Sequence, residues 1–251
     1  LGVDVRREKI EDKPINDDYR LGLHVGGEGT VPETSASRTV SAVFGEVSLP
    51  FVRNLEASAA VRYDHYSDVG SKTNPRVSLR WQPSKDMLMR ASAGAGFRAP
   101  SLWDLNAPPA FSNTANQVND PGCPAALIAN QDPRCLQVQL TTRLSSSPDL
   151  KPETSKQWSI GMVLEPFRTL SIGLDYWRIT KKDNIGVLTA DTILANPDDL
   201  TLYNQFRSRF VRNAQGTTLY VDQPAENLGG LRTAGWDIDV RAHLPIAAGR
   251  L

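Results

Sequence analysis

Few residues of this 251-residue chain have the types and the spacing that chemistry requires. The chain has three histidines, which are His24, His65 and His243. None lies near a cysteine, so the four closely spaced ligands of a zinc site are missing. Asp64 and His65 are adjacent, but neighbours in a strand point to opposite faces of a sheet and cannot form a catalytic dyad. Ser155 and Ser159 lack GxSxG surroundings. The sequence therefore predicts no enzyme, no metal site and no cofactor.

The two cysteines, Cys123 and Cys135, lie in NDPGCPAALIANQDPRCLQ, a segment rich in Pro, Asp and Asn. Eleven residues separate them, whereas a redox pair more usually has two intervening residues. A local disulfide is the simplest interpretation, and it implies an oxidising compartment. Two free thiols are the alternative.

The composition is that of a folded protein without a strong electrostatic field. Lys and Arg together number 28, as do Asp and Glu, so the formal net charge is zero and no attraction to nucleic acid is expected. No run of 18 apolar residues is present, which excludes a transmembrane helix. A membrane β-barrel is still allowed, because its alternating strands leave a weak hydropathy signal. The chain opens on LGVDVRREK without a Met and ends on HLPIAAGRL; we expect an internal piece of a longer protein.

Apolar residues alternate with polar or small ones in six segments. These are 55–64, 76–82, 87–97, 157–165, 170–176 and 235–244. A period of two with one apolar face is typical of a strand in an antiparallel sheet. Weaker alternation near residues 1–9 and 39–49 brings the expected number of strands to about eight.

Short and long connections alternate along this order of strands. Turns are expected at 49–54, 82–86 and 165–169. Long connections are expected at roughly 10–38, 98–152 and 181–228, with a medium one at 66–73. In an up-and-down sheet, all short turns then lie at one end and all long loops at the other. Outer-membrane barrels have this arrangement, and soluble sandwiches seldom do.

Aromatic residues recur near the ends of the predicted strands. They are Trp81, Phe97, Trp158, Tyr176, Trp177 and Trp236. Such rings prefer the membrane–water interface, so they favour aromatic girdles around a barrel. The alternative is ordinary packing against cross-strand neighbours.

Three ordered stretches resemble TonB-dependent outer-membrane receptors. In residues 61–105 a predicted strand ends in GFRAPS and enters a long loop, and in 147–185 the chain returns through LKPE, Leu150 to Glu153. The stretch GLRTAGWDIDVRAHL, 230–244, is similar to a family strand opened by Gly and an acidic residue, with Asp237 where Glu is commoner. The resemblance covers most of residues 39–244, and residues 1–38 match loosely.

This resemblance implies an all-β fold. The chain would form an antiparallel up-and-down transmembrane β-barrel segment, about eight strands of a larger plugged barrel of about 22, with long extracellular loops. Residues 1–251 would be a partial barrel domain without the plug domain and the closing C-terminal strands. The implied location is the outer membrane of a Gram-negative cell.

The implied activity is TonB-energised uptake of a scarce ligand, such as a ferric siderophore, haem, cobalamin or an oligosaccharide. The implied partners are outer-membrane lipid, that small ligand, and the TonB complex, which engages a segment before the plug. Nucleic acid is not expected as a partner. Two alternatives stay open, a passive porin-type barrel and a soluble β-sandwich binding module.

Candidate ligand contacts begin at Arg98, on the lumen-facing side of the predicted strand end. The others follow the strand exit and are Trp103, Asn106, Phe111 and Asn113. These side chains could stack on a bulky ligand and hydrogen-bond to it. The alternative for each is packing within the loop, and Arg98 could instead pair with a plug carboxylate or with Asp104.

Two segments of the last long connection have regular patterns. Residues 197–210, PDDLTLYNQFRSRF, predict a short amphipathic helix that packs within the loop. Residues 217–223, TTLYVDQ, predict a small extracellular strand.

Overall fold

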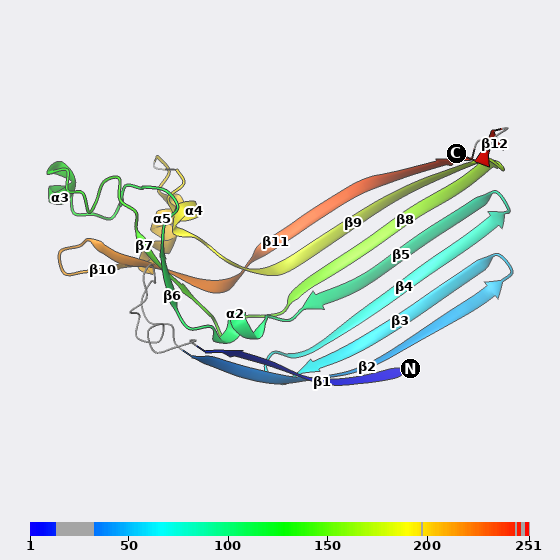
Figure 1. The fold of residues 1–251 in the computed structure, drawn as a ribbon, viewed down its shortest axis with the longest axis horizontal. Coiled ribbons are helices and arrows are strands. Elements are labelled where there is room, and N and C mark those ends of the chain that lie inside the picture. The colour runs from blue at the N-terminus through cyan, green and yellow to red at the C-terminus, as the bar shows by residue number, and fades with distance from the viewer. Residues whose placement is uncertain (14–32, 197, 244, 247–248, 251) are drawn as a thin grey trace.

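Eight long strands form one curved antiparallel wall in the computed structural model, which describes residues 1–13, 33–196, 198–243, 245–246 and 249–250 (Figure 1). In the order in which they pair, the strands are β1 (Gly2–Asp12), β2 (Thr34–Val52), β3 (Leu55–Tyr66), β4 (Gly70–Ser84), β5 (Met87–Arg98), β8 (Glu153–Phe167), β9 (Leu170–Val187) and β11 (Thr218–Ala242). Each wall strand is antiparallel to the next along the chain. The predicted up-and-down topology is confirmed.

Three short connections lie together at one end of the wall. The closing pairs are Val52 with Leu55, Ser84 with Met87 and Phe167 with Leu170, and each follows a register irregularity. All three turns lie at the right of Figure 1, opposite the long connections. The turns predicted at 49–54, 82–86 and 165–169 therefore share one end, as expected. The segregation is incomplete, because β3 and β4 are joined at the other end by the short turn 67–69. Of the long connection expected at 10–38, residues 14–32 lie outside the described part of the chain.

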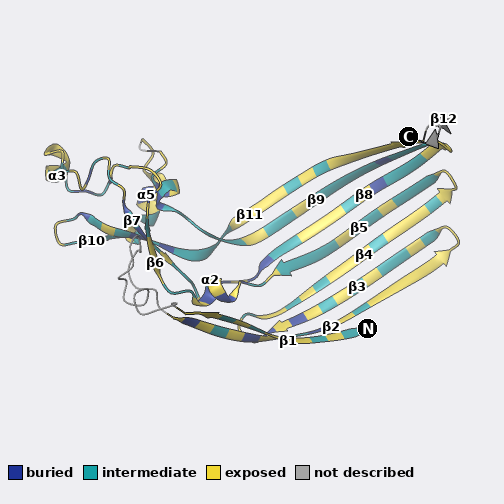
Figure 2. Cartoon of the chain, viewed as in Figure 1, coloured by how far each residue is buried: buried dark blue, intermediate teal, exposed yellow. Residues whose placement is uncertain are grey.

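The two faces of the wall differ in polarity because apolar and polar residues alternate along each strand. Val77, Ile160 and Ile238 are exposed on the face that we call outer. On the inner face, Arg90 of β5 reaches across β8 to Asp175 of β9, with 2.8 Å between Nε and Oδ1. Figure 2 shows exposed and partly buried positions alternating along the strands. Within the described residues the wall is one continuous sheet, which differs from the two packed sheets of a β-sandwich.

Shorter elements form a layer beyond the loop end of the wall. They are α2 (Leu102–Asn106), β6 (Ala110–Asn113), α3 (Ala125–Ala129), β7 (Thr141–Ser145), α4 (Ala190–Ile193), α5 (Thr201–Phe206), the 3₁₀ turn η1 (Arg207–Arg209) and β10 (Phe210–Arg212). A separate hairpin of β12 (Pro245–Ile246) and β13 (Gly249–Arg250) follows the wall. None of the helices in the described ranges is long and apolar enough to cross a membrane.

Strand β11 joins the wall to this loop layer. Its later residues pair with β9, whereas Val221–Pro224 pair in parallel with β7 and the first residues pair with β10. Where β11 and β9 leave the wall, Gly229 (φ 27°) and Asp183 (φ 57°) have left-handed backbone conformations between two paired positions. Such conformations favour Gly and are tolerated by Asp, which accounts for the bend here.

The principal hydrophobic core of the described residues lies in the loop layer. Its buried members are Leu140, Ala190, Ile193, Tyr203, Phe210 and Val221. Tyr203 and Phe210 pack edge to face at 5.1 Å between ring centroids, which is a favourable geometry for aromatic pairs. The helix expected at 197–210 packs within the loop as predicted. The observed helix, α5, is shorter than predicted.

Candidate functional site at the loop end of the wall

The GFRAPSLWDL segment ends β5 and starts a short helix. Ser101 caps α2, because its Oγ accepts a hydrogen bond from the Asp104 backbone N–H (3.0 Å) and Asp104 accepts one from the Ser101 N–H (2.9 Å). Leu102 and Leu105 are buried beneath the helix. Arg38 of β2 donates to the Pro100 carbonyl oxygen at 2.7 Å, so the chain folds inward over the wall as it leaves the strand.

Arg98 joins the two motif-bearing strands. Its guanidinium makes a bidentate pair with Glu153, at 3.0 Å and 2.7 Å. Glu153 is buried and also accepts a hydrogen bond from the Ile185 backbone N–H at 2.8 Å. The suggested pairing of Arg98 with Asp104 is wrong, because Asp104 is engaged in capping α2. The start of the GFRAPS loop and the end of its LKPE return are thus held by one ion pair.

The four predicted loop contacts do not form a single pocket. Trp103 lines a cavity of 270 Å³ together with Ala110 of β6 and Leu144 of β7. Phe111 follows Ala110 in the same strand and therefore points to the opposite face of the small sheet. Asn106 donates to the Leu102 carbonyl at 2.9 Å.

The side of the small sheet that carries Phe111 combines aromatic and charged groups. Phe111 packs edge to face on Tyr220 of β11 at 5.9 Å, and the Arg143 guanidinium lies 5.1 Å from the Tyr220 ring centroid. Arg143 also pairs with Asp222 at 2.9 Å. We call these four residues the aromatic–arginine face. Its rings can stack on planar groups and its guanidinium can bind anionic oxygen atoms.

Asn113 ends β6 beside this face. It is exposed, and its Oδ1 lies 3.4 Å from the Thr141 hydroxyl, which donates to it. Sequence reasoning found Phe111 and Asn113 but missed Arg143 and Tyr220. The strand containing Tyr220 was predicted. Its parallel neighbour at 141–145 was not, because the alternation of apolar and polar residues there is too short to identify a strand.

A disulfide and a buried ion pair hold the outlying loop. Cys123 and Cys135 are bonded, with Cα atoms 5.8 Å apart, as predicted. Between the loop and β10, the Asp120 side chain, which is fully buried, pairs with Arg212 at 2.6 Å and accepts from the Thr218 hydroxyl at 2.7 Å. Burial by itself would raise the pKa of Asp120, but hydrogen bonds from Arg212, Thr218 and the Gly122 backbone N–H lower that pKa below its usual value.

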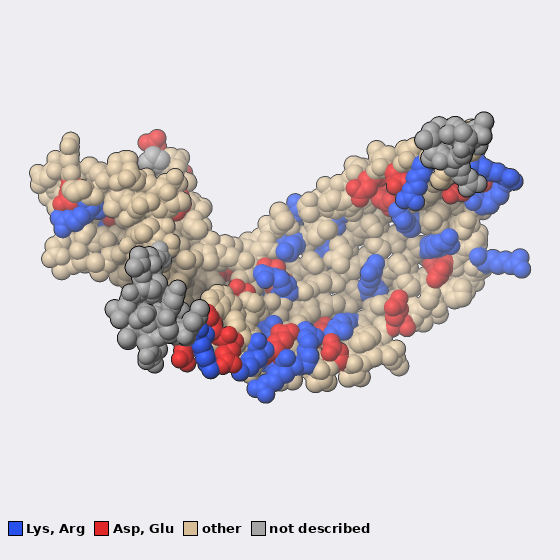
Figure 3. Space-filling view, in the orientation of Figure 1, with Lys and Arg blue, Asp and Glu red and all other residues tan. Residues whose placement is uncertain are grey.

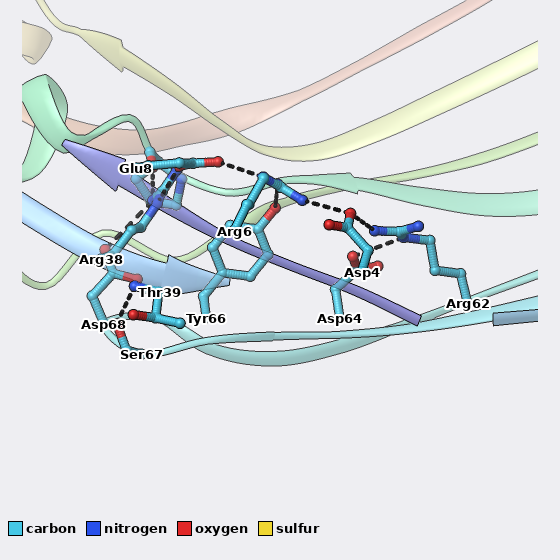
Figure 4. Close-up of polar contacts among 11 residues, drawn as sticks. Asp4, Arg6, Glu8, Arg38, Thr39, Arg62, Asp64, Tyr66, Ser67 and Asp68 are labelled. Atoms are coloured by element: carbon cyan, nitrogen blue, oxygen red, sulfur yellow. Dashed lines mark hydrogen bonds and ion pairs between the residues drawn. The ribbon is translucent and has the colours of Figure 1, made fainter. Parts of the chain in front are cut away.

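Charged side chains also line the inner face of β1 to β3, where they pair across the strands (Figure 4). Arg38 contacts Glu8 at 2.6 Å and Asp68 at 3.4 Å. Arg62 similarly contacts Asp4 at 3.0 Å and the neighbouring Asp64. Figure 3 shows acidic and basic side chains interleaved over these strands. An inner face of paired charges is suited to an aqueous interior.

Within the described ranges, no group of three or more His, Cys, Asp or Glu side chains is placed to hold a metal ion. The wall is instead a single curved sheet with an apolar outer face, a charged inner face and an ordered loop layer at one end. Together these features define the wall of an outer-membrane type of β-barrel.

The chain belongs to the TonB-dependent receptor-like β-barrel family, whose model matches residues 2–249. Over 74% of this chain, it is 22% identical to the ferric enterobactin receptor of Pseudomonas aeruginosa. Over 64% of this chain, it is 21% identical to the ferrienterobactin receptor of Escherichia coli (strain K12). These matches cover 23% and 20% of the two relatives, so the chain spans less than a quarter of their length.

Solved structures agree on the fold. A crystal structure of a ferric enterobactin receptor mutant from Pseudomonas aeruginosa matches 98% of this chain with a TM-score of 0.64 and 20% identity. The siderophore receptor PirA from Acinetobacter baumannii matches 99% with a TM-score of 0.62 and 16% identity. The chain covers 30% and 32% of those two structures.

Proposed function

We propose that residues 1–251 form part of the barrel wall and the extracellular loops of an outer-membrane receptor for ferric siderophores. The observation that carries this proposal is the match of nearly the whole chain, loop layer included, to ferric enterobactin and siderophore receptors. The continuous path of β11 from the wall into the loop layer supports it, because a receptor needs its binding loops fixed to the barrel. Transport, rather than catalysis, is the activity proposed.

The proposed protein is longer than this chain. Its relatives extend well beyond the matched region, and we infer that the complete receptor adds a plug domain and the strands that close the barrel. The TonB complex would act through a segment preceding that plug. The charged inner face of β1 to β3 would then border the plugged lumen, and the apolar outer face would contact outer-membrane lipid.

The proposed ligand site is the aromatic–arginine face, with Trp103, Asn106 and Asn113 as further contacts and Arg98 at the rim of the wall. Ferric catecholate complexes carry planar aromatic rings and negative charge, and they fit a guanidinium beside aromatic rings. Arg143 and Phe111 are the residues that we expect to contribute most. Arg98 has the smaller role, since Glu153 already engages its guanidinium in two hydrogen bonds.

Uptake of radiolabelled ferric enterobactin tests this function. The full-length gene product that contains residues 1–251 would be expressed in a Gram-negative strain lacking its own ferric catecholate receptors, with TonB and without it. Uptake that requires both the protein and TonB is the expected result. Uptake independent of TonB would instead support the porin-type alternative, and binding of no siderophore would contradict the proposed ligand class.

A further inference from the structure

A row of aromatic rings crosses the outer face of β8, β9 and β11. Trp158 packs on Tyr176 at 5.3 Å between centroids, and Tyr176 packs on Trp236 at 4.8 Å. Trp158 and Trp236 are exposed, although each is a large apolar side chain. Rows of this kind mark the level of a membrane interface in β-barrels.

Four basic residues lie on the same outer face, between this row and the loop end. They are Lys156 of β8, Arg178 and Lys182 of β9, and Arg232 of β11. Residues paired directly across neighbouring strands share a face. Arg178 lies opposite Trp158, and Thr180 lies opposite both Lys156 and Arg232. We call these four residues the outer basic cluster.

The outer basic cluster has no acidic partner in the described part of the chain. The ion pairs of β8 and β9 involve the inner-face residues Glu153, Asp175 and Lys181. No described carboxylate lies within ion-pairing distance of any member of the cluster. This differs from the inner face, where cations and carboxylates are paired. Basic side chains at the headgroup level attract anionic lipid, and no described carboxylate neutralises these four.

A hollow adjoins the cluster at the same level. Strand β4 stops pairing with β5 beyond Arg76 and Gly94, and a cavity of 340 Å³ opens there. Lys156, Lys182, Thr180 and Phe97 are among the residues that line it. Ammonium and hydroxyl groups above an apolar floor match a charged headgroup with acyl chains below it. Long Lys and Arg side chains on a membrane surface extend toward the headgroup level.

We propose that the outer basic cluster and this hollow bind the phosphate groups of a phosphorylated lipid in the membrane leaflet next to the loops. The inference rests on the outer-membrane location given under the proposed function, but it does not depend on the siderophore. Charge-assisted hydrogen bonds from Lys and Arg to phosphate oxygen atoms supply the affinity. The aromatic row below fixes the depth of the headgroup.

Lipid A carrying two phosphates is a suitable probe, in nanodiscs of phosphatidylcholine that hold the full-length gene product. The site variant K156Q/K182Q/R232Q removes three charges from the cluster. The control variant R53Q/K85Q/R168Q removes three charges at the opposite, turn end of the wall, where Arg53, Lys85 and Arg168 lie. We expect the site variant to bind lipid A at least about tenfold more weakly, and the control variant to match the parent protein within about twofold.

The parent protein provides a second measurement that requires no folded variant. Dephosphorylated lipid A should bind it at least about tenfold more weakly than the diphosphorylated form, and millimolar inorganic phosphate should not compete. Equal binding of the two lipids, or an equal loss of binding in both variants, would overturn the proposal. Siderophore uptake by the same preparations tests the proposed function separately: lost uptake with retained lipid binding would refute the receptor and leave the lipid site standing.

Discussion

The side chain of Asn227 pairs with the backbone of Lys151 as a neighbouring strand would. Its Nδ2 donates to the Lys151 carbonyl oxygen at 2.8 Å, and its Oδ1 accepts from the Lys151 N–H at 2.9 Å. The same Nδ2 also donates to the Asp183 carbonyl at 2.8 Å, at the bend of β9. One amide of β11 thus holds the LKPE return of the first long loop against the point where two strands leave the wall.

Asn227→Asp is expected to loosen this return. A carboxylate keeps the acceptor but lacks the donor, so the carbonyls of Lys151 and Asp183 lose their partner and face a negative charge. Loss of an exposed hydrogen bond of this kind costs about 0.5–1.5 kcal/mol. Limited proteolysis of the LKPE return, residues 150–153, should accelerate, whereas Asn54→Asp in an exposed turn at the other end should leave it unchanged. Unchanged proteolysis in both variants would show that Asn227 has no such role.

Replacing both cysteines by serine is expected to release the outlying loop without disturbing the wall. In the chain-entropy view, closing a loop of about 13 residues stabilises the folded state by roughly 3 kcal/mol. Limited proteolysis should therefore cut residues 124–134 faster in the double variant, with the wall strands still protected. Proteolysis at the parent rate would mean that the core of the loop layer, not the disulfide, determines the order of this segment.

The loop layer is expected to loosen only in acid. The pKa of Asp120 is lowered in the folded protein, so the carboxylate's contribution to stability is fully present above its unfolded pKa of about 3.9. That contribution is lost as the pH falls through the lower, folded pKa. Proteolysis of the loop should thus be constant from pH 8 to pH 5 and should rise below about pH 4. A rise that begins near pH 6 would point to a different titrating group.

Asp120→Asn tests the same ion pair at neutral pH. Removing one partner of a buried pair costs about 3–5 kcal/mol, and the lower end applies here because Arg212 retains some exposure. Faster hydrogen exchange across β10 is the expected result. The matched control is Asp132→Asn, which removes an exposed pair with Arg134 in the same loop and should have little effect.

The proposed ligand face makes a prediction about affinity. Phe111→Ala and Arg143→Ala should each weaken binding of ferric enterobactin by about fivefold or more, because each removes a stacking or charged contact worth at least about 1 kcal/mol. Fluorescence quenching titration on the full-length gene product would measure this. Phe167→Ala, an exposed aromatic at the turn end, should bind as the parent does. Equal affinities throughout would place the ligand elsewhere.

The wall was predictable from sequence because its signal is local. Alternation along 55–64 or 170–176 reports the face of each residue directly, and prolines and charges mark the turns between strands. Even the weakly alternating segments proved to be strands, β1 and β2, although β2 is much longer than its predicted core at 39–49. The disulfide was predictable for the same reason, since two cysteines close in sequence need little help from the fold.

The loop layer was not predictable, because its contacts join residues far apart in sequence. Arg98 lies near Asp104 along the chain, yet its partner is Glu153, which the sheet brings directly opposite. The aromatic–arginine face requires β7 to lie parallel to β11, a pairing that no alternation of five residues can specify. Trp103 and Phe111 are close in sequence but lie on opposite sides of the small sheet, because Trp103 lies beside Ala110 and Phe111 points to the other face of β6. Local chemistry identified the right loop but not its faces.

The most direct test of the membrane wall is labelling by a photoactivated carbene probe dissolved in the acyl chains around the reconstituted full-length gene product. Mass spectrometry should find modification of the outer-face residues Val77, Ile160 and Ile238. The inner-face residues Ser159 and Asp175 should remain unmodified. Such a contrast between faces, seen directly at the neighbours Ser159 and Ile160 of β8, is expected only if one face of a single sheet meets lipid. Equal labelling of both faces, or none on either, would contradict the barrel wall.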